Sequence, residues 1–155
     1  MKIAVITISD RASKGVYADR SGPAIETVLR ELLPTIEIER DLVPDEKAEI
    51  LAALGRHPGA DWILTTGGTG PAPRDVTPEA TREFCDRAMP GIAEFLRLRS
   101  LEETPHAVFS RGEAGMRGGQ YVVNFPGSEK AARSCTAWLA PLLDHGVKMA
   151  RGEGH

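Results

Sequence analysis

A run of glycine and polar residues at positions 65–81 gives the clearest indication of chemistry in this chain. Three glycines fall within four positions, at Gly67, Gly68 and Gly70. Because glycine has no Cβ, it tolerates positive φ and lets backbone N–H groups converge on an anion such as phosphate. Thr69, Arg74 and Asp75 add a hydroxyl, a cation and a carboxylate beside the glycines. These residue types at this spacing predict an anion-binding loop.

The residues after this loop have the composition of a helix start. Thr77 suits the N-cap, Pro78 suits the first helical position, and Glu79 complements the positive end of the helix dipole. A phosphate bound there would lie at a helix N-terminus. Neither the P-loop nor the dinucleotide-binding spacing fits these residues. The alternative interpretation is a simple turn after a buried strand, with Asp75 as a surface charge. This segment alone does not decide between an anion-binding loop and a structural turn.

Composition narrows the class of protein. With 155 residues and 41% hydrophobic content, we expect one domain that spans residues 1–155. The formal net charge of -3 and the absence of a Lys/Arg run disfavour a nucleic-acid or anionic-membrane surface. The chain begins with a strand-like pattern and has no apolar run of membrane-spanning length, so we expect a soluble, cytoplasmic protein.

Cys85 and Cys135 have the spacing of neither a metal site nor a redox site, and we expect reduced core thiols. No ligand spacing connects the four histidines, His57, His106, His145 and His155.

Apolar periodicity alternates between strand and helix along the chain. Strands are predicted at 3–8, 36–43, 61–66 and 120–125. Helices are predicted at 21–33, 46–54, 78–88, 91–101 and 128–150, the last with a kink or break at Pro141. Strands separated by helices of this length imply right-handed crossovers. The pattern therefore predicts an α/β fold in which helices cover both faces of a mostly parallel sheet.

Polar turns follow the predicted strands. They are Ser9-Asp10-Arg11, Pro44-Asp45-Glu46, the glycine loop with Asp75, Ser110-Arg111 after a later segment, and Asn124-Phe125-Pro126-Gly127-Ser128. In open sheets of this kind, ligands bind beyond the carboxyl ends of the strands, so these turns predict one shared cleft. Structural roles are also open for single members: Asp45 as a helix N-cap, Asp10 in an exposed ion pair, and Ser110 or Asn124 as turn residues.

The chain resembles, over nearly its whole length, the MogA/MoaB family of molybdenum-cofactor biosynthesis proteins. The family includes molybdopterin adenylyltransferases and domains of fusion proteins such as gephyrin. The similarity is carried by residues 8–15, 66–70, 73–81 and 124–127. It implies a three-layer α/β/α domain, usually a homotrimer, that transfers AMP from ATP to the terminal phosphate of molybdopterin. Pyrophosphate leaves in a Mg²⁺-dependent reaction, and a separate metal-insertion protein is expected to take the product.

The resemblance also assigns roles to particular positions. Asp45 and Asp75 match the two important acidic residues of the family, and we interpret them as catalytic Mg²⁺ holders. The second pKa of a phosphate monoester is about 6, so the nucleophile needs little help from a base. Charge neutralisation should then dominate, with Arg74 or Arg111 receiving pyrophosphate charge. The predicted substrate- and nucleotide-binding residues are Ser9, Asp10, Gly67, Gly68, Thr69, Gly70, Arg74, Thr77, Ser110, Arg111, Asn124, Pro126, Gly127 and Ser128.

Two other functions remain open from the sequence. Related proteins of the same fold bind the pterin without adenylating it, so a non-catalytic molybdopterin-binding module or carrier is the main alternative. The presence of both Asp45 and Asp75 favours the enzyme. Hydrolysis of another phosphate ester is a third hypothesis with weaker support.

Overall fold

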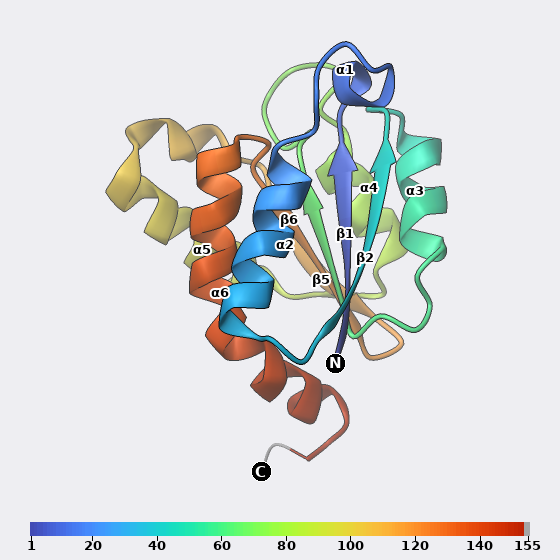
Figure 1. The fold of residues 1–155 in the computed structure, drawn as a ribbon, viewed down its shortest axis with the longest axis vertical. Helices are drawn as coiled ribbons and strands as arrows, with labels where there is room; N and C mark the ends of the chain where they lie inside the picture. Colours follow the sequence, from blue (N-terminus) through green and yellow to red (C-terminus); the bar gives the residue numbers. More distant parts are fainter. Residues whose placement is uncertain (154–155) are drawn as a thin grey trace.

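The computed structural model describes residues 1–153 as a sheet with helices on both faces (Figure 1). The strands are β1 (Lys2–Ile8), β2 (Glu37–Val43), β3 (Trp62–Thr66), β4 (Arg87–Ala88), β5 (Ala114–Arg117) and β6 (Gln120–Phe125). The helices are α1 (Asp10–Ser13), α2 (Ser21–Leu32), α3 (Lys47–Gly55), α4 (Thr77–Phe84), α5 (Pro90–Glu103), the 3₁₀ helix η1 (Pro105–Phe109) and α6 (Glu129–Ala150). The predicted α/β class is confirmed. His155 lies outside the described residues.

The sheet is mixed, with strand order β2-β1-β3-β6-β5-β4. Strands β2, β1, β3 and β6 are parallel, whereas β5 is antiparallel to β6 and β4 is antiparallel to β5. The carboxyl ends of the four parallel strands therefore meet at one edge, next to α1 at the top of Figure 1. The predominance of parallel pairs was predicted, but the strand order was not.

The central strands are buried on both faces, which explains their continuous apolar runs. Ile3 and Val5 belong to the core under α2, α5 and α6, while Ala4 and Ile6 belong to the core under α3 and α4. Trp62 is almost fully buried. Its ring stacks on that of Tyr121 with centroids 4.1 Å apart, so two neighbouring strands are joined by an aromatic pair.

The sequence prediction was wrong about the end of one helix, and of the kink or break predicted at Pro141 the structure excludes the break. Helix α4 ends at Phe84 rather than at residue 88, because Arg87 and Ala88 pair with β5 as strand β4. Helix α6 continues through Pro141 without a break. Pro141 and Ala137 both lie on the exposed side of α6, where water can bind the carbonyl that the proline leaves without an N–H donor. Strand β5 and the short helices α1 and η1 were not predicted.

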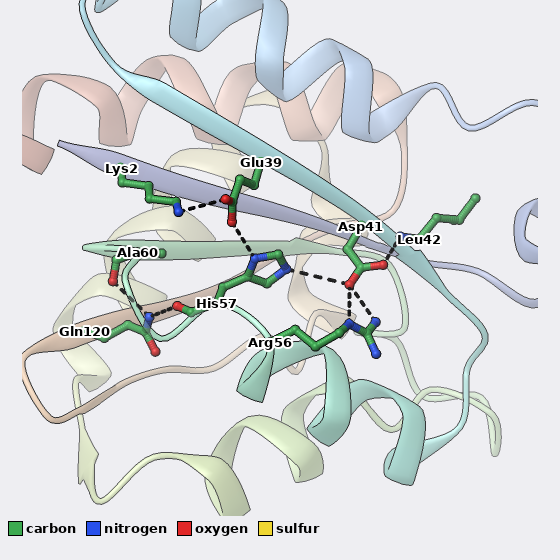
Figure 2. Close-up of polar contacts among 8 residues, drawn as sticks. All are labelled: Lys2, Glu39, Asp41, Leu42, Arg56, His57, Ala60 and Gln120. Carbon is green, nitrogen blue, oxygen red and sulfur yellow. Dashed lines mark hydrogen bonds and ion pairs between the residues drawn. The ribbon is translucent and has the colours of Figure 1, made fainter.

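A polar cluster joins the loop after α3 to strand β2 (Figure 2). The buried His57 places Nδ1 2.9 Å from Glu39 Oε2 and Nε2 3.6 Å from Asp41 Oδ2. Arg56 binds the same Asp41 oxygen through Nε at 2.9 Å and Nη2 at 2.6 Å. Lys2 of β1 pairs with Glu39 at 2.7 Å. These contacts give His57 a structural role. Among the described residues, no helix has the length and hydropathy needed to cross a membrane.

Candidate active site

A cavity of about 630 Å³ lies at the carboxyl ends of β1, β2 and β3. Its lining includes the turns that follow all three strands. The predicted site residues that line it are Ser9, Asp10, Asp45, Gly67, Gly68, Asp75 and Gly127. The structure thus brings the two predicted catalytic aspartates to one cavity, although they come from different loops.

A second cavity of about 270 Å³ lies on the other side of the glycine loop, between that loop, α5 and the start of α6. The predicted residues that line this cavity are Thr69, Gly70, Ser110, Asn124, Pro126 and Ser128. Apolar side chains such as Leu96 and Phe109 complete its wall. Thirteen of the sixteen predicted residues therefore line two cavities instead of one shared cleft, and the glycine loop contributes residues to both. Arg74, Thr77 and Arg111 line neither cavity.

The glycine loop passes very close to the neighbouring loops. Gly67 has a φ of +103° and Gly68 a φ of +64°, values that favour glycine. A Cβ at Gly67 would lie 2.2 Å from the carbonyl oxygen of Ile8, and a Cβ at Gly68 would lie 3.0 Å from Asp45 Oδ1. The first two glycines are therefore needed for both the shape of the loop and its contact with the loops after β1 and β2.

Thr77 closes the glycine loop and does not cap the helix. Helix α4 begins at Thr77, its N-cap position is Val76, and no side chain caps it. The fully buried Thr77 donates from Oγ1 to the Gly67 carbonyl at 2.9 Å and from its backbone N–H to the Gly68 carbonyl at 3.1 Å. The predicted N-cap was wrong because the hydroxyl turns back toward the loop, where it holds the glycines in place.

Asp45 is tied to the loop after β1. Its Oδ2 accepts a 2.8 Å hydrogen bond from the Asp10 N–H, and the Asp45 N–H donates to Asp10 Oδ1 at 3.0 Å. Burial raises the pKa of Asp45, and the negative charges of Asp10 and Asp75 raise it further. The N-cap alternative for Asp45 is wrong, because Glu46 holds the N-cap position of α3 and no side chain makes a cap bond there. The site of Asp45 therefore concentrates negative charge, which a cation would offset.

Asp75 lies at the far end of the glycine loop in a tight turn. Its Oδ2 accepts from the Ala72 N–H at 3.1 Å, and its own N–H donates to the Ala72 carbonyl at 2.9 Å. Among the described residues, Oδ1 of Asp75 and Oδ1 of Asp45 have no protein hydrogen-bond donor. Each aspartate thus has one oxygen held by backbone and one oxygen left for another group.

The donor chemistry of these two carboxylates is compatible with a Mg²⁺ ion. Oxygen donors suit Mg²⁺, which commonly takes only one or two protein carboxylates and completes its shell with water and phosphate oxygens. Residues 1–153 contain no group of three or more His, Cys, Asp or Glu side chains arranged to hold a metal ion. A cation held by Asp45 and Asp75 would therefore need oxygens from water or substrate.

Arg111 supports the glycine loop from the side of the second cavity. Its N–H donates to the Thr69 carbonyl at 2.8 Å, and Nε donates to the Gly70 carbonyl at 2.9 Å. Nη2 donates to the Asp75 carbonyl at 2.7 Å, and Nη1 pairs with Glu79. These contacts occupy the guanidinium that was expected to receive pyrophosphate charge. We interpret Arg111 as a support for the loop, a role that the sequence did not indicate.

The Arg111–Glu79 pair predicts a pH dependence of stability. The Arg111 guanidinium holds the pKa of Glu79 below its ordinary value of 4.5. A carboxyl with a lowered pKa stabilises the folded state above the unfolded-state pKa, and this stabilisation is lost as the pH falls through the folded-state pKa. For Glu79→Gln, we expect the free energy of unfolding to fall less steeply between about pH 5 and about pH 3 than in the wild type.

Urea unfolding at a series of pH values measures this slope. Glu31→Gln is a matched control, because Glu31 is exposed on α2 and has no ion pair within the described part of the chain. Equal slopes for the Glu79 and Glu31 variants would contradict the prediction.

Several predicted binding residues already make hydrogen bonds within the protein. Asn124 donates from Nδ2 to Thr65 Oγ1 at 2.9 Å and to Thr81 Oγ1 at 2.8 Å, and its Oδ1 accepts from the Glu113 N–H at 3.1 Å. Ser110 Oγ accepts from the Gly112 N–H at 3.3 Å, and Ser128 Oγ caps α6 by accepting from the Ala131 N–H at 3.2 Å. Their side chains line the second cavity but already hold the backbone around it.

Sequence reasoning missed part of the first cavity. Tyr17, Asp19, Arg20 and Glu129 also line it. Tyr17 Oη lies 3.2 Å from Ser9 Oγ, so the loop between α1 and α2 folds back over the turn after β1. The prediction considered only residues that directly follow a strand, and a loop that returns to the cleft leaves no such local signal.

Comparison with known proteins identifies close similarity over the whole domain. The family model described as "Probable molybdopterin binding domain" matches residues 4–145. The chain is 43% identical over 154 residues to molybdopterin adenylyltransferase of Helicobacter pylori strain J99, covering 97% of this chain and 88% of that protein. It is 42% identical over 156 residues to molybdopterin adenylyltransferase of Escherichia coli K12, covering 98% of this chain and 76% of that protein. The crystal structure of the molybdopterin biosynthesis enzyme MoaB from Thermus thermophilus superposes with a TM-score of 0.84 at 42% identity, covering 97% of this chain and 96% of that one.

Proposed function

The chain belongs to the molybdopterin-binding family that matches residues 4–145, and on this basis we propose that it is a molybdopterin adenylyltransferase. The observation that carries the proposal is 42–43% identity over nearly the whole chain to enzymes of that name. As a nucleotidyltransferase of molybdenum cofactor biosynthesis, it transfers AMP from ATP to the terminal phosphate of molybdopterin and releases pyrophosphate.

Two cavities on either side of one anion-binding loop suit a reaction between two phosphorylated substrates. In our proposal the reacting phosphates meet at Gly67 and Gly68, where close backbone approach is possible. Asp45 and Asp75 bind Mg²⁺ from the wall of the larger cavity. When bound, the cation neutralises phosphate charge and helps to align the groups for displacement at phosphorus.

The protein itself contributes mainly positioning in this mechanism. The attacking monoester is already largely ionised near neutral pH, because its second pKa is about 6. Asp45 and Asp75 therefore act as metal ligands and not as proton-transfer groups. The loop contacts of Thr77 and Arg111 keep the glycines and Asp75 in a fixed arrangement, so little reorganisation is needed during the reaction.

The remaining parts of the proposal concern assembly and location. Exposed apolar side chains on α5 and η1 support association into the homotrimer expected for the family; they are Leu98, Leu101, Val108 and Phe109. Cys85 and Cys135 are free thiols, which suits a reducing compartment such as the cytoplasm. Burial raises their pKa values to about 11 and about 12, so both thiols are weak nucleophiles. A separate metal-insertion protein would take the adenylylated product.

The proposal is tested by incubating the protein with molybdopterin, ATP and MgCl₂ and measuring pyrophosphate together with the mass of the pterin product. We expect stoichiometric pyrophosphate and adenylylated molybdopterin, both abolished by EDTA. Tight pterin binding without pyrophosphate would support the carrier instead, and release of inorganic phosphate from the pterin would support a hydrolase.

A further inference from the structure

Asp10 and Asp45 form a two-way connection between the loops after β1 and β2. Each aspartate accepts a hydrogen bond from the backbone N–H of the other, at 2.8 Å and 3.0 Å. Charged acceptors make such bonds stronger than neutral ones. The position of the Asp45 carboxylate is therefore coupled to that of Asp10.

Arg74 extends this connection to the glycine loop. Its Nε donates to Asp10 Oδ2 at 3.0 Å and its Nη2 donates to Asp10 Oδ1 at 2.9 Å, which is the bidentate arrangement. Arg74 also contacts Glu46 Oε1 at 2.9 Å. Because Asp75 follows Arg74 directly in the chain, the Arg74–Asp10 pair ties the backbone that carries Asp75 to Asp10. The Asp10–Asp45 hydrogen bonds continue this connection to the loop that carries Asp45.

We propose that Asp10 and Arg74 are positioning residues that set the separation of the Asp45 and Asp75 carboxylates. The inference rests on the proposed function, since it concerns the two residues assigned to Mg²⁺. Asp45 and Asp75 are like charges on separate loops, and their repulsion favours a wider separation. The Arg74–Asp10 pair opposes this by holding the two loops together.

This role differs from the substrate-binding role that the sequence predicted for the same residues. A substrate ligand needs free polar atoms, whereas both Asp10 oxygens already accept hydrogen bonds from Arg74, and one also accepts from the Asp45 N–H. Arg74 is the less enclosed partner, with a side chain that is 55% exposed, so direct contact with a phosphate is the competing role that the experiment must separate.

The test compares Arg74→Gln, Asp10→Asn and the double variant with the wild type. Metal affinity is measured by calorimetric titration of Mg²⁺, and by Mn²⁺ paramagnetic resonance, into protein saturated with a non-hydrolysable ATP analogue. Removing a residue that orients a metal ligand typically weakens metal affinity by about 10–100-fold, and we expect this range for both single variants. Both substitutions remove the same ion pair. The metal affinity of the double variant should therefore be no weaker than that of the single variant that binds metal less tightly.

Kinetics supply a second measurement. At saturating Mg²⁺, we expect lower kcat with KM for ATP changed less than about twofold, since a positioning residue does not contact the nucleotide. Arg74→Lys should behave like Arg74→Gln, because lysine keeps the charge but cannot form the bidentate pair. Arg56→Gln is the matched control: it breaks another exposed Arg–Asp pair, with Asp41, that contributes to neither cavity.

Other results would overturn the inference. A raised KM for ATP or weaker pterin binding in Arg74→Gln, with unchanged metal affinity and rescue by lysine, would make Arg74 a phosphate ligand. Additive losses in the double variant would show that Asp10 acts independently of Arg74. If the Arg74 and Asp10 variants unfold at urea midpoints near that of the Arg56→Gln control, their losses of metal affinity and kcat are not caused by unfolding. Failure of the proposed function is distinguishable, because then the wild type itself would form no adenylylated pterin.

Discussion

Replacing Asp75 with asparagine should lower kcat by about 10²–10³-fold, the cost of removing one electrostatic contact to the transition state. Asparagine keeps an oxygen that can accept the 3.1 Å hydrogen bond from the Ala72 N–H, so the turn that carries the side chain should persist. What is lost is the negative charge, which the proposed mechanism uses to hold Mg²⁺ next to the phosphates. Pterin affinity should change much less than kcat, because in the proposed mechanism Asp75 acts through the metal and not on the pterin.

The measurement is steady-state pyrophosphate release as a function of ATP, Mg²⁺ and molybdopterin, combined with direct pterin binding. Asp144→Asn is a suitable control, since Asp144 is an exposed acid on α6 that lines neither cavity. Equal losses in kcat and pterin affinity, in a variant with an unchanged urea midpoint, would contradict the metal role. Equal losses with a lowered midpoint would indicate a folding defect, and Asp45→Asn would then repeat the test at the other carboxylate.

The sequence indicated where the candidate site lies because parallel strands place their carboxyl ends at one edge. Ser9 and Gly67 directly follow β1 and β3, and Asp45 is the second residue after β2. The position of a residue that follows a buried strand can be predicted from local sequence alone. Ser110 and Arg111 reach the same edge for another reason, since they precede β5, which runs antiparallel to β6. The prediction of one cleft depended on strand direction, which alternating strands and helices do indicate.

What each side chain does at that edge depended on contacts between distant residues. The guanidinium of Arg111 bonds to a Gly70 carbonyl 41 residues away, and Asn124 binds Thr65 across 59 residues. Arginine and asparagine can each bind a phosphate, and each can also hold a loop together through hydrogen bonds. Residue type alone therefore does not separate a binding role from a structural role. The short strand β5 has a weak pattern of its own and forms through pairing with β6, which is why it was missed.

Replacing Gly67 with alanine should give the largest loss of stability. A non-glycine residue in a sparsely populated backbone region costs about 1–3 kcal/mol, and Gly67 has a φ of +103°. The added Cβ would also lie 2.2 Å from the carbonyl oxygen of Ile8, which is backbone and cannot rotate away. Gly67 is further confined because its N–H donates to the Phe125 carbonyl at 3.2 Å. The ends of β1, β3 and β6 would have to separate, so we expect the loss to exceed the cost of backbone strain alone.

Gly15→Ala separates the two contributions. Gly15 also has a positive φ, of +72°, but nothing lies within 4 Å of the Cβ that alanine would add. Urea unfolding of Gly15→Ala therefore measures strain with no collision, and the additional loss in Gly67→Ala measures the contact with Ile8. If the two variants lose equal stability, the strand ends can separate freely and the close approach of β1 to the glycine loop does not constrain the site. A larger loss in Gly67→Ala would mean that the same close packing which positions the anion-binding loop also stabilises the centre of the sheet.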